Sequence, residues 1–410
     1  MSLRALSWRW LRGVAVAGAV LAATPVGSAG AAARYEEIDV PSTQGNIDLS
    51  YVKLNKVSSL MATVRLPDGY DADPTKQWPV LYMLPGIGDN SRAWAYPGTG
   101  NLEALVGDLP AIVVMPEGGK GFFVDWWRGG SRTGANWMRY TLDEVLPTIE
   151  SRYRIKPGRQ FHSVGGISMG GYGALEFASQ LPGYFGSAIS MSGLVDPQTL
   201  DTYSLLPQSI GASYETVWGP LYGAYANSLN PSKNPQNLAD SRLYLSVGNG
   251  IPDPAFPFSQ DAWTKGVVLE GLTLAQNTRY DAILTLAGVQ HVMKYRGGVH
   301  DWPYWRRELP TALAWDPFAE PPVSLSNSTY WSYRTMQPHG NAWSIGYRFS
   351  GRPIAPLSLQ RTGQRLAASG TGTVTISPGA AEGDATGAGT RPDCSFTAAL
   401  PFVRQLPAGC

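Results

Sequence analysis

The chain has 410 residues, 43% of them hydrophobic, which is enough to bury a full core and to form more than one folded unit. Its 32 basic and 31 acidic residues leave a formal net charge of +1, so no basic surface is expected to attract nucleic acid or an anionic membrane. The two cysteines and four histidines show no ligand spacing typical of zinc or iron–sulfur sites. We therefore expect neither a metal nor any other cofactor.

The first residues are typical of a secretory signal peptide. Arg4, Arg9 and Arg12 precede an apolar run at 13–23, and small residues follow it. The run is too short and too rich in alanine for a transmembrane anchor. We expect residues 1–33 to be removed and the mature protein to be secreted or held in the cell envelope.

Residues 34–318 alternate between apolar runs and helical stretches. Strand-like runs that end at turn residues cover 60–67, 78–86, 110–116, 186–192, 242–247 and 281–286. Helical spacing covers 136–153, and a second helix is expected at 174–181. This alternation predicts an α/β catalytic domain with a mostly parallel, doubly wound sheet. Its chemistry should lie beyond the C-terminal ends of the strands.

Aromatic residues are abundant, with 14 tryptophans and 20 tyrosines. They indicate either dense core packing or an apolar or sugar-lined cleft. Residues 197–237 are long, aromatic and poorly periodic. That segment is either a lid-like insertion over the cleft or an ordinary helical connection.

The last part of the chain, residues 319–410, has a different pattern. Alternating segments at 342–349 and 372–376 are separated by glycine-rich turns, which predicts a small β-rich module. Cys394 and Cys410 are the only cysteines, so in an exported protein we expect them to form a disulfide. The module either binds an acceptor or the cell wall, or is purely structural.

A candidate nucleophile lies in Gly166-Ile167-Ser168-Met169-Gly170, which fits the G-x-S-x-G elbow of α/β-hydrolases. This pattern holds a serine on a sharp turn between a strand and a helix. Serine needs a general base, and the base needs an orienting acid. In this fold the three follow the chain order serine, acid, histidine.

His300 is the candidate base because it lies in a glycine-flanked loop that leads into a helix at 305–315. His291 lies in a polar connection and His339 in the C-terminal module. His162 precedes the elbow and is interpreted as a structural, partly buried residue.

The residue pattern alone does not decide which residue is the acid of the triad. Asp253, in the loop after the strand at 242–247, has the usual position, and Asp281 and Asp261 are further candidates. The oxyanion hole needs two backbone N–H groups. Met169, next to the nucleophile, and Ile87, after the strand at 78–86, are expected to provide them.

Several short motifs together resemble the secreted mycolyltransferase (antigen 85) family of α/β-hydrolases and its esterase relatives. They run in family order over about residues 51–315: Val114-Met115-Pro116, Phe123-Val124-Asp125-Trp126, Gly166 to Gly170, Leu243 to Gly250, Leu269-Glu270-Gly271-Leu272-Thr273-Leu274 and His300-Asp301-Trp302-Pro303-Tyr304-Trp305.

The resemblance implies a different acid, Glu270, in place of Asp253. It also implies that Ile87 and Met169 donate the oxyanion N–H groups. Trp126 and Trp302 lie in the matching motifs and are candidates for the substrate cleft.

One departure bears on the acceptor. Family members that acylate trehalose carry an Asp-Gly-Leu-Arg-like sequence where this chain has Pro85-Gly86-Ile87-Gly88, so the side chains that hold the sugar there are missing. We expect a serine acyl-ester hydrolase or acyltransferase that acts on a sugar or lipid hydroxyl, such as a glycolipid acceptor. The alternatives are a plain carboxylesterase and a non-catalytic binding protein of the cell envelope.

Overall fold

The computed structural model describes residues 34–43, 47, 60–127, 136–256, 260–321, 325, 328–383, 385 and 392–410. The signal peptide expected at 1–33 lies outside these residues. None of the helices in the described ranges combines the length and the apolar character needed to cross a membrane.

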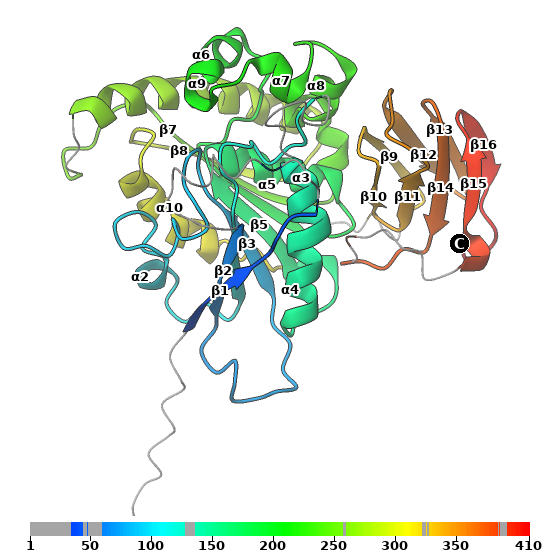
Figure 1. Cartoon of the computed structure of the whole chain (residues 1–410), viewed down its shortest axis with the longest axis horizontal. Helices are drawn as coiled ribbons and strands as arrows, with labels where there is room; N and C mark the ends of the chain where they lie inside the picture. Colours follow the sequence, from blue (N-terminus) through cyan, green and yellow to red (C-terminus); the bar gives the residue numbers. More distant parts are fainter. Residues whose placement is uncertain are drawn as a thin grey trace, which may run out of the picture.

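A large sheet forms the centre of the molecule (Figure 1). Among the described residues its eight strands follow the order β1-β2-β4-β3-β5-β6-β7-β8. β1, β2 and β4 pair antiparallel, and every pair from β4 to β8 is parallel. The predicted α/β-hydrolase sheet is confirmed. The strands are β1 (Arg34–Asp39), β2 (Met61–Leu66), β3 (Val80–Leu84), β4 (Ile112–Pro116), β5 (His162–Ile167), β6 (Ser187–Met191), β7 (Arg242–Gly248) and β8 (His291–Arg296).

Helices cover both faces of this sheet because successive strand residues point to opposite sides. Val80, Tyr82 and Leu84 of β3 pack in the core that contains α4, α5 and part of α9. Leu81 and Met83 pack in a second core beneath α2 and α10. The helices on these faces are α2 (Leu102–Val106), α3 (Trp137–Arg139), the π-helical turn η1 (Tyr140–Val145), α4 (Leu146–Arg152), α5 (Met169–Gln180), α9 (Gln260–Leu286) and α10 (Trp302–Ala314), with the short 3₁₀ turn η2 (Arg159–Phe161) before β5.

The strand predicted at 281–286 is wrong. These residues form the last turns of α9, and the next strand begins only at His291. Tyr280 and Leu284, four residues apart, are both buried in the core. A short apolar run cannot distinguish a strand from the buried face of a helix, and here the helical spacing decides.

The segment at 197–237 combines both predicted roles. Its elements lie together with α9 along one edge of the molecule (Figure 1). Tyr214, Trp218 and Tyr225 are buried in the core, whereas Thr202 and Leu205 of α6 line a pocket at Ser168. The elements are α6 (Leu200–Ile210), α7 (Tyr214–Trp218), α8 (Ala224–Ser228), η3 (Pro231–Lys233) and η4 (Pro235–Leu238).

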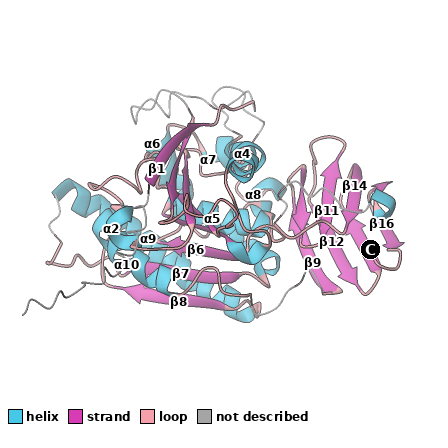
Figure 2. Cartoon of the chain, turned by 90° about the horizontal axis from the view of Figure 1, so that it is seen from below, coloured by secondary structure: helices cyan, strands magenta, loops and turns pink. Residues whose placement is uncertain are grey.

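Two antiparallel sheets follow near the C-terminus and lie to one side of the large sheet (Figure 2). Their strand orders are β10-β11-β14-β15 and β16-β13-β12-β9, and apolar side chains of both sheets form a shared core. A disulfide joins Cys394 to Cys410 as expected. The elements are β9 (Tyr330–Thr335), β10 (His339–Ala342), β11 (Ile345–Phe349), β12 (Leu357–Thr362), β13 (Arg365–Ser369), β14 (Thr373–Pro378), η5 (Pro392–Cys394), β15 (Phe396–Ala399) and β16 (Phe402–Gln405).

Buried polar groups join these sheets to the rest of the chain. The Asp240 carboxylate accepts hydrogen bonds from Arg159 at 3.1 and 3.2 Å and from the Trp343 indole at 2.7 Å. The Asn237 side-chain amide pairs with the backbone of Arg334 in both directions, at 2.8 and 3.0 Å. The amide thus extends β9 as a neighbouring strand would.

Candidate active site

Ser168 occupies the turn between β5 and α5 with φ 53° and ψ −117°. A β-carbon on Gly166 would lie 2.5 Å from the Gly170 carbonyl carbon, and one on Gly170 would lie 2.3 Å from the Leu84 oxygen. Both separations are too short for any residue but glycine. Glycine at these two positions therefore lets the strand and the helix approach closely, and Ser168 holds the left-handed backbone at the tip.

Ser168, His300 and Glu270 form a continuous hydrogen-bonded chain. Ser168 Oγ lies 2.8 Å from His300 Nε2, and His300 Nδ1 lies 2.7 Å from Glu270 Oε2. A carboxylate only accepts, so Nδ1 carries the proton and Nε2 is free to accept the serine proton. This geometry is that of a nucleophile, a base and an orienting acid.

Glu270 lies on α9 and is 1% exposed. Its Oε1 accepts hydrogen bonds from the Ser192 hydroxyl at 2.7 Å and from the Gly248 backbone N–H. Thr273 Oγ1 lies 3.4 Å from Oε2. With these donors both oxygens are partnered, which compensates for burying the charge and fixes the carboxylate beside His300.

The structure gives the alternative acids other partners. Asp253 lies 3.2 Å from Arg307 in a partly exposed ion pair. Asp281 accepts hydrogen bonds from His291 and Tyr295 at 2.7 and 2.9 Å. The side chain of Asp261 lies outside the described residues.

The loop after β3 carries Ile87, which lines the same pocket as Ser168 and Met169. The buried carboxylate of Glu117 accepts hydrogen bonds from the N–H groups of Ser91 and Gly119, each at 3.2 Å. Burial raises the pKa of Glu117 to about 7. Glu117 thus joins the end of β4 to the loop on which Ile87 lies.

The pocket at Ser168 is mostly apolar and has a volume of about 640 Å³, which includes the open solvent at its mouth. Trp126 and Trp302 are not among the described residues that line it, so the prediction that they form the cleft is corrected. Trp126 is 1% exposed in the core, and Trp302 packs edge-on against Trp94 and Trp305. The lining residues are Ile87, Phe122, Ser168, Met169, Leu194, Asp201, Thr202, Leu205, Leu269, Leu272, Thr273, Gln276 and His300.

Comparison with known proteins identifies the family. A family model described as Esterase matches residues 58–315, which is more than half of the chain. The chain belongs to the Esterase family. The resemblance expected from the motifs is confirmed at the level of the family.

Curated relatives of the chain include two mycobacterial proteins. Esterase Rv1288 of Mycobacterium tuberculosis is 30% identical over 56% of this chain and 49% of its own length. The diacylglycerol acyltransferase/mycolyltransferase Ag85A of Mycobacterium gordonae is 29% identical over 61% of this chain and 78% of its own. The chain thus spans about half the length of Rv1288.

Solved structures share the esterase fold. The serine hydrolase FphF of Staphylococcus aureus superimposes on 70% of the chain with a TM-score of 0.54 and 18% identity, and all of that protein is covered. MPT51 of M. tuberculosis also superimposes on 70% of the chain, with a TM-score of 0.53, 21% identity and 98% of its own length covered.

Two residues beside the candidate triad were not predicted from the sequence as part of the site. Ser192 follows β6 in a left-handed conformation with φ 50°, and its hydroxyl contacts Glu270. Trp305 donates to the Ser192 oxygen at 3.1 Å and lies edge-on to the His300 ring. Trp305 lies in a motif of the family, but nothing in its sequence context indicates a contact with Ser192. In the described ranges, no group of three His, Cys, Asp or Glu side chains could hold a metal ion.

Proposed function

We propose that this chain is an exported serine acyl-ester hydrolase or acyltransferase that works through a Ser168–His300–Glu270 triad. The observation that carries the proposal is the hydrogen-bonded chain of 2.8 and 2.7 Å, which opens on an apolar pocket. The family assignment supports ester chemistry, and the order of the three residues along the chain is the one expected of this fold.

In the first half-reaction, Ser168 Oγ attacks the ester carbonyl carbon while its proton passes to His300 Nε2. The backbone N–H groups of Ile87 and Met169 donate to the oxygen that becomes negatively charged. The bond to the leaving alcohol then breaks, and His300 returns the proton to that alcohol. The product of this step is an acyl ester on Ser168.

In the second half-reaction, His300 takes a proton from water or from an acceptor alcohol, which attacks the acyl carbonyl. Ser168 leaves and recovers its proton from His300. Glu270 stabilises the imidazolium in both halves and keeps Nδ1 protonated. No cofactor enters either step.

The pocket supports a substrate with an apolar acyl or aryl group. Its walls are aliphatic and aromatic near Ser168, with Ile87, Phe122 and Leu272 among them. The lining also includes polar side chains from α6 and α9, Thr202 and Gln276, which are hydrogen-bonded to each other at 3.1 Å. Ligand sites are commonly built in this way, from apolar surface with a few orienting polar groups.

The test compares wild type, Ser168→Ala and His300→Ala in turnover of p-nitrophenyl esters, with thermal unfolding as the folding control. We expect each variant to lose turnover by about 10³-fold or more while it stays folded. A fluorophosphonate probe should label wild type at Ser168 and leave Ser168→Ala unlabelled. Full activity in both variants would exclude the triad, and an unlabelled wild type would favour the non-catalytic binding protein.

Transfer to an alcohol is the second candidate. The relative Ag85A is named an acyltransferase, whereas the relative Rv1288 is named an esterase. Product analysis with and without added glycerol or trehalose distinguishes the two: a hydrolase releases only the free acid, and a transferase also forms the new ester. We expect trehalose to be a poor acceptor, since Pro85 to Gly88 lack the charged side chains of the sugar-acylating sequence.

We also propose that residues 1–33 form the export signal, residues 34–318 the catalytic domain and residues 319–410 a structural or binding module. Mass spectrometry of the secreted protein tests the first boundary. An N-terminus beginning within about five residues of position 34 is expected, and retention of Arg4 in the exported protein would contradict it.

A further inference from the structure

A second, polar pocket lies where the catalytic part of the chain meets the C-terminal sheets. It has a volume of about 560 Å³, which includes the open solvent at its mouth, and it shares no lining residue with the pocket at Ser168. Four of its residues precede residue 319 and four follow it. They are Asp125, Asn136, Arg139 and Tyr225 on one side, and Met336, Gln337, Pro338 and Arg352 on the other.

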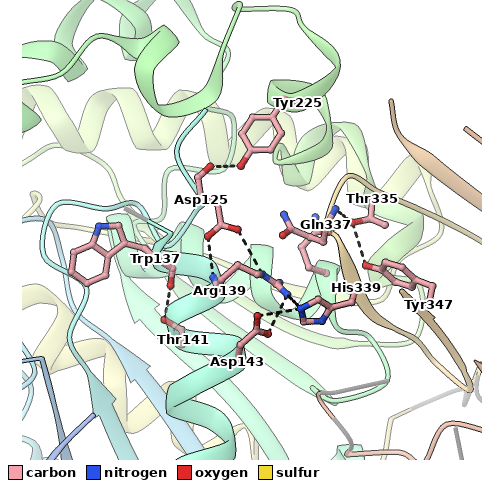
Figure 3. Close-up of polar contacts among 11 residues, drawn as sticks. Asp125, Trp137, Arg139, Thr141, Asp143, Tyr225, Thr335, Gln337, His339 and Tyr347 are labelled. Carbon is pink, nitrogen blue, oxygen red and sulfur yellow. Dashed lines mark hydrogen bonds and ion pairs between the residues drawn. The ribbon is translucent and has the colours of Figure 1, made fainter. Parts of the chain in front are cut away.

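Arg139 is the unusual residue of this pocket because its guanidinium is buried but incompletely partnered. Its side chain is only 8% exposed. Nη1 lies 3.2 Å from Asp143 and 3.4 Å from the His339 ring, as Figure 3 shows. Nη2 has no hydrogen-bond partner. Folded proteins rarely leave a buried guanidinium N–H unpaired, so an unpaired donor on a residue that lines a pocket points to a ligand.

The charges that line the pocket are unequal. Arg139 and Arg352 bring two positive charges, against the single carboxylate of Asp125. Asp125 is already engaged, because it accepts a hydrogen bond of 3.0 Å from the Arg139 backbone and lies 3.6 Å from Arg139 Nε. Burial raises the pKa of Asp125 although Arg139 opposes the shift. Asp143, which lies outside the lining, also pairs with Arg139 at 3.2 Å, whereas no carboxylate of the described residues forms an ion pair with Arg352. The uncompensated positive charge of the pocket is therefore that of Arg352.

Arg352 approaches from the other side. It lies in the exposed connection between β11 and β12, and its guanidinium carbon is 5.9 Å from the centre of the Tyr225 ring. The Tyr225 hydroxyl in turn donates to the Asp125 backbone oxygen. A ligand between Arg139 and Arg352 would thus contact both parts of the chain.

We propose that this pocket binds a small molecule through an oxyanion group, a carboxylate or a phosphate, held between Arg139 and Arg352. The planar guanidinium presents paired N–H donors that match both groups. The unpartnered Nη2 of Arg139 donates from the buried end, and Arg352 closes the exposed end. Gln337 lines the same pocket and would contact the neutral part of the ligand.

The test measures thermal unfolding of the mature protein at constant ionic strength, with sodium chloride replaced stepwise by inorganic phosphate or by malonate. A ligand that binds only the folded state raises the midpoint in a saturable way. We expect a rise of about 2–4 °C with at least one of the two anions at concentrations well above the dissociation constant. The anion that acts identifies phosphate or carboxylate as the natural group.

Arg352→Gln is the deciding variant because Arg352 is exposed and its loss should not prevent folding. It should weaken the response about tenfold or more in anion concentration, since it removes a charged hydrogen bond to the ligand. Arg365→Gln, an equally exposed arginine on β13 outside the pocket, controls for general charge and should respond like wild type. Equal midpoints in chloride, phosphate and malonate, or an unchanged response in Arg352→Gln, would overturn the proposal.

Discussion

Ser192 Oγ donates a hydrogen bond of 2.7 Å to Oε1 of Glu270, the carboxylate oxygen that His300 does not use. The same hydroxyl oxygen accepts from the Trp305 indole at 3.1 Å. The Trp305 ring also lies edge-on to His300, with ring centres 5.0 Å apart. The candidate acid and base are thus positioned by one buried set of contacts.

Ser192→Ala should therefore lower kcat and leave KM nearly unchanged. The change removes a hydrogen bond to a charged acceptor, worth about 1.5–3 kcal/mol, and frees the carboxylate to rotate away from His300. We expect kcat to fall about tenfold or more, because part of this loss reaches the transition state. Ser192 does not line the substrate pocket, so binding should persist. Ser151→Ala, on the exposed face of α4, is the matched control, and a raised KM with unaltered kcat would contradict this role.

Glu270→Gln and Asp253→Asn distinguish the two candidate acids. A glutamine at position 270 would present either an amide oxygen or an amide NH₂ to His300 and would not stabilise the imidazolium, so kcat for ester turnover should fall by about 10³- to 10⁴-fold. Asp253→Asn breaks only a partly exposed ion pair with Arg307 and should retain activity within a factor of about three. Activity retained in Glu270→Gln but lost in Asp253→Asn would remove Glu270 from the triad.

Two glycine substitutions should have opposite effects. In Gly170→Ala the new methyl group would lie 2.3 Å from the Leu84 oxygen, so the turn that holds Ser168 must shift and ester turnover should be lost. In Gly271→Ala, in the middle of α9, the methyl group meets nothing within 4 Å. Alanine there should raise the free energy of unfolding by about 0.5–1 kcal/mol, through helix propensity, with activity retained. Denaturant unfolding and turnover of the two variants, measured side by side, check both expectations.

The free energy of unfolding should fall as the pH rises, because the buried Glu117 carboxyl loses its proton. Burial raises the pKa of Glu117 from 4.5 to about 7, so the unfolded chain ionises first as the pH rises. The stabilising contribution is complete below pH 4.5 and is lost as the pH passes the folded pKa. Between about pH 5 and 8 the free energy of unfolding of wild type should drop by about 2–3 kcal/mol relative to Glu117→Gln.

Denaturant titrations at several pH values measure this difference, and Glu320→Gln, an exposed glutamate, serves as the control. Burial also raises the pKa of Asp89 to about 6, so Asp89→Asn should remove a further part of the pH dependence. Parallel pH curves for wild type and Glu117→Gln would contradict the assignment.

The sequence predicted the sheet better than it predicted the site. Strands such as β3 and β7 were recognisable because they are buried on both faces and end at turn residues. Glu270 followed only from the family resemblance, because pattern places the acid in a loop after a strand and this one lies inside α9. Ser192 was missed because nothing in the sequence around a serine that follows a strand predicts its contact with Glu270, 78 residues later. Trp126 was misplaced because its position in a family motif does not distinguish a tryptophan in the core from one in a cleft.

The Asp240 carboxylate binds Arg159 on one side and the Trp343 indole on the other. This contact limits the exchange of the C-terminal sheets between related proteins. A chimaera that grafts residues 319–410 onto another member of the family must also supply an acid at this position. It must further supply an amide in place of Asn237 to pair with the backbone at Arg334. Without them the graft would bury unpaired donors at its seam. The C-terminal sheets therefore cannot be transferred on their own. A protein that accepts them should carry an acid at the position of Asp240 and an amide at the position of Asn237.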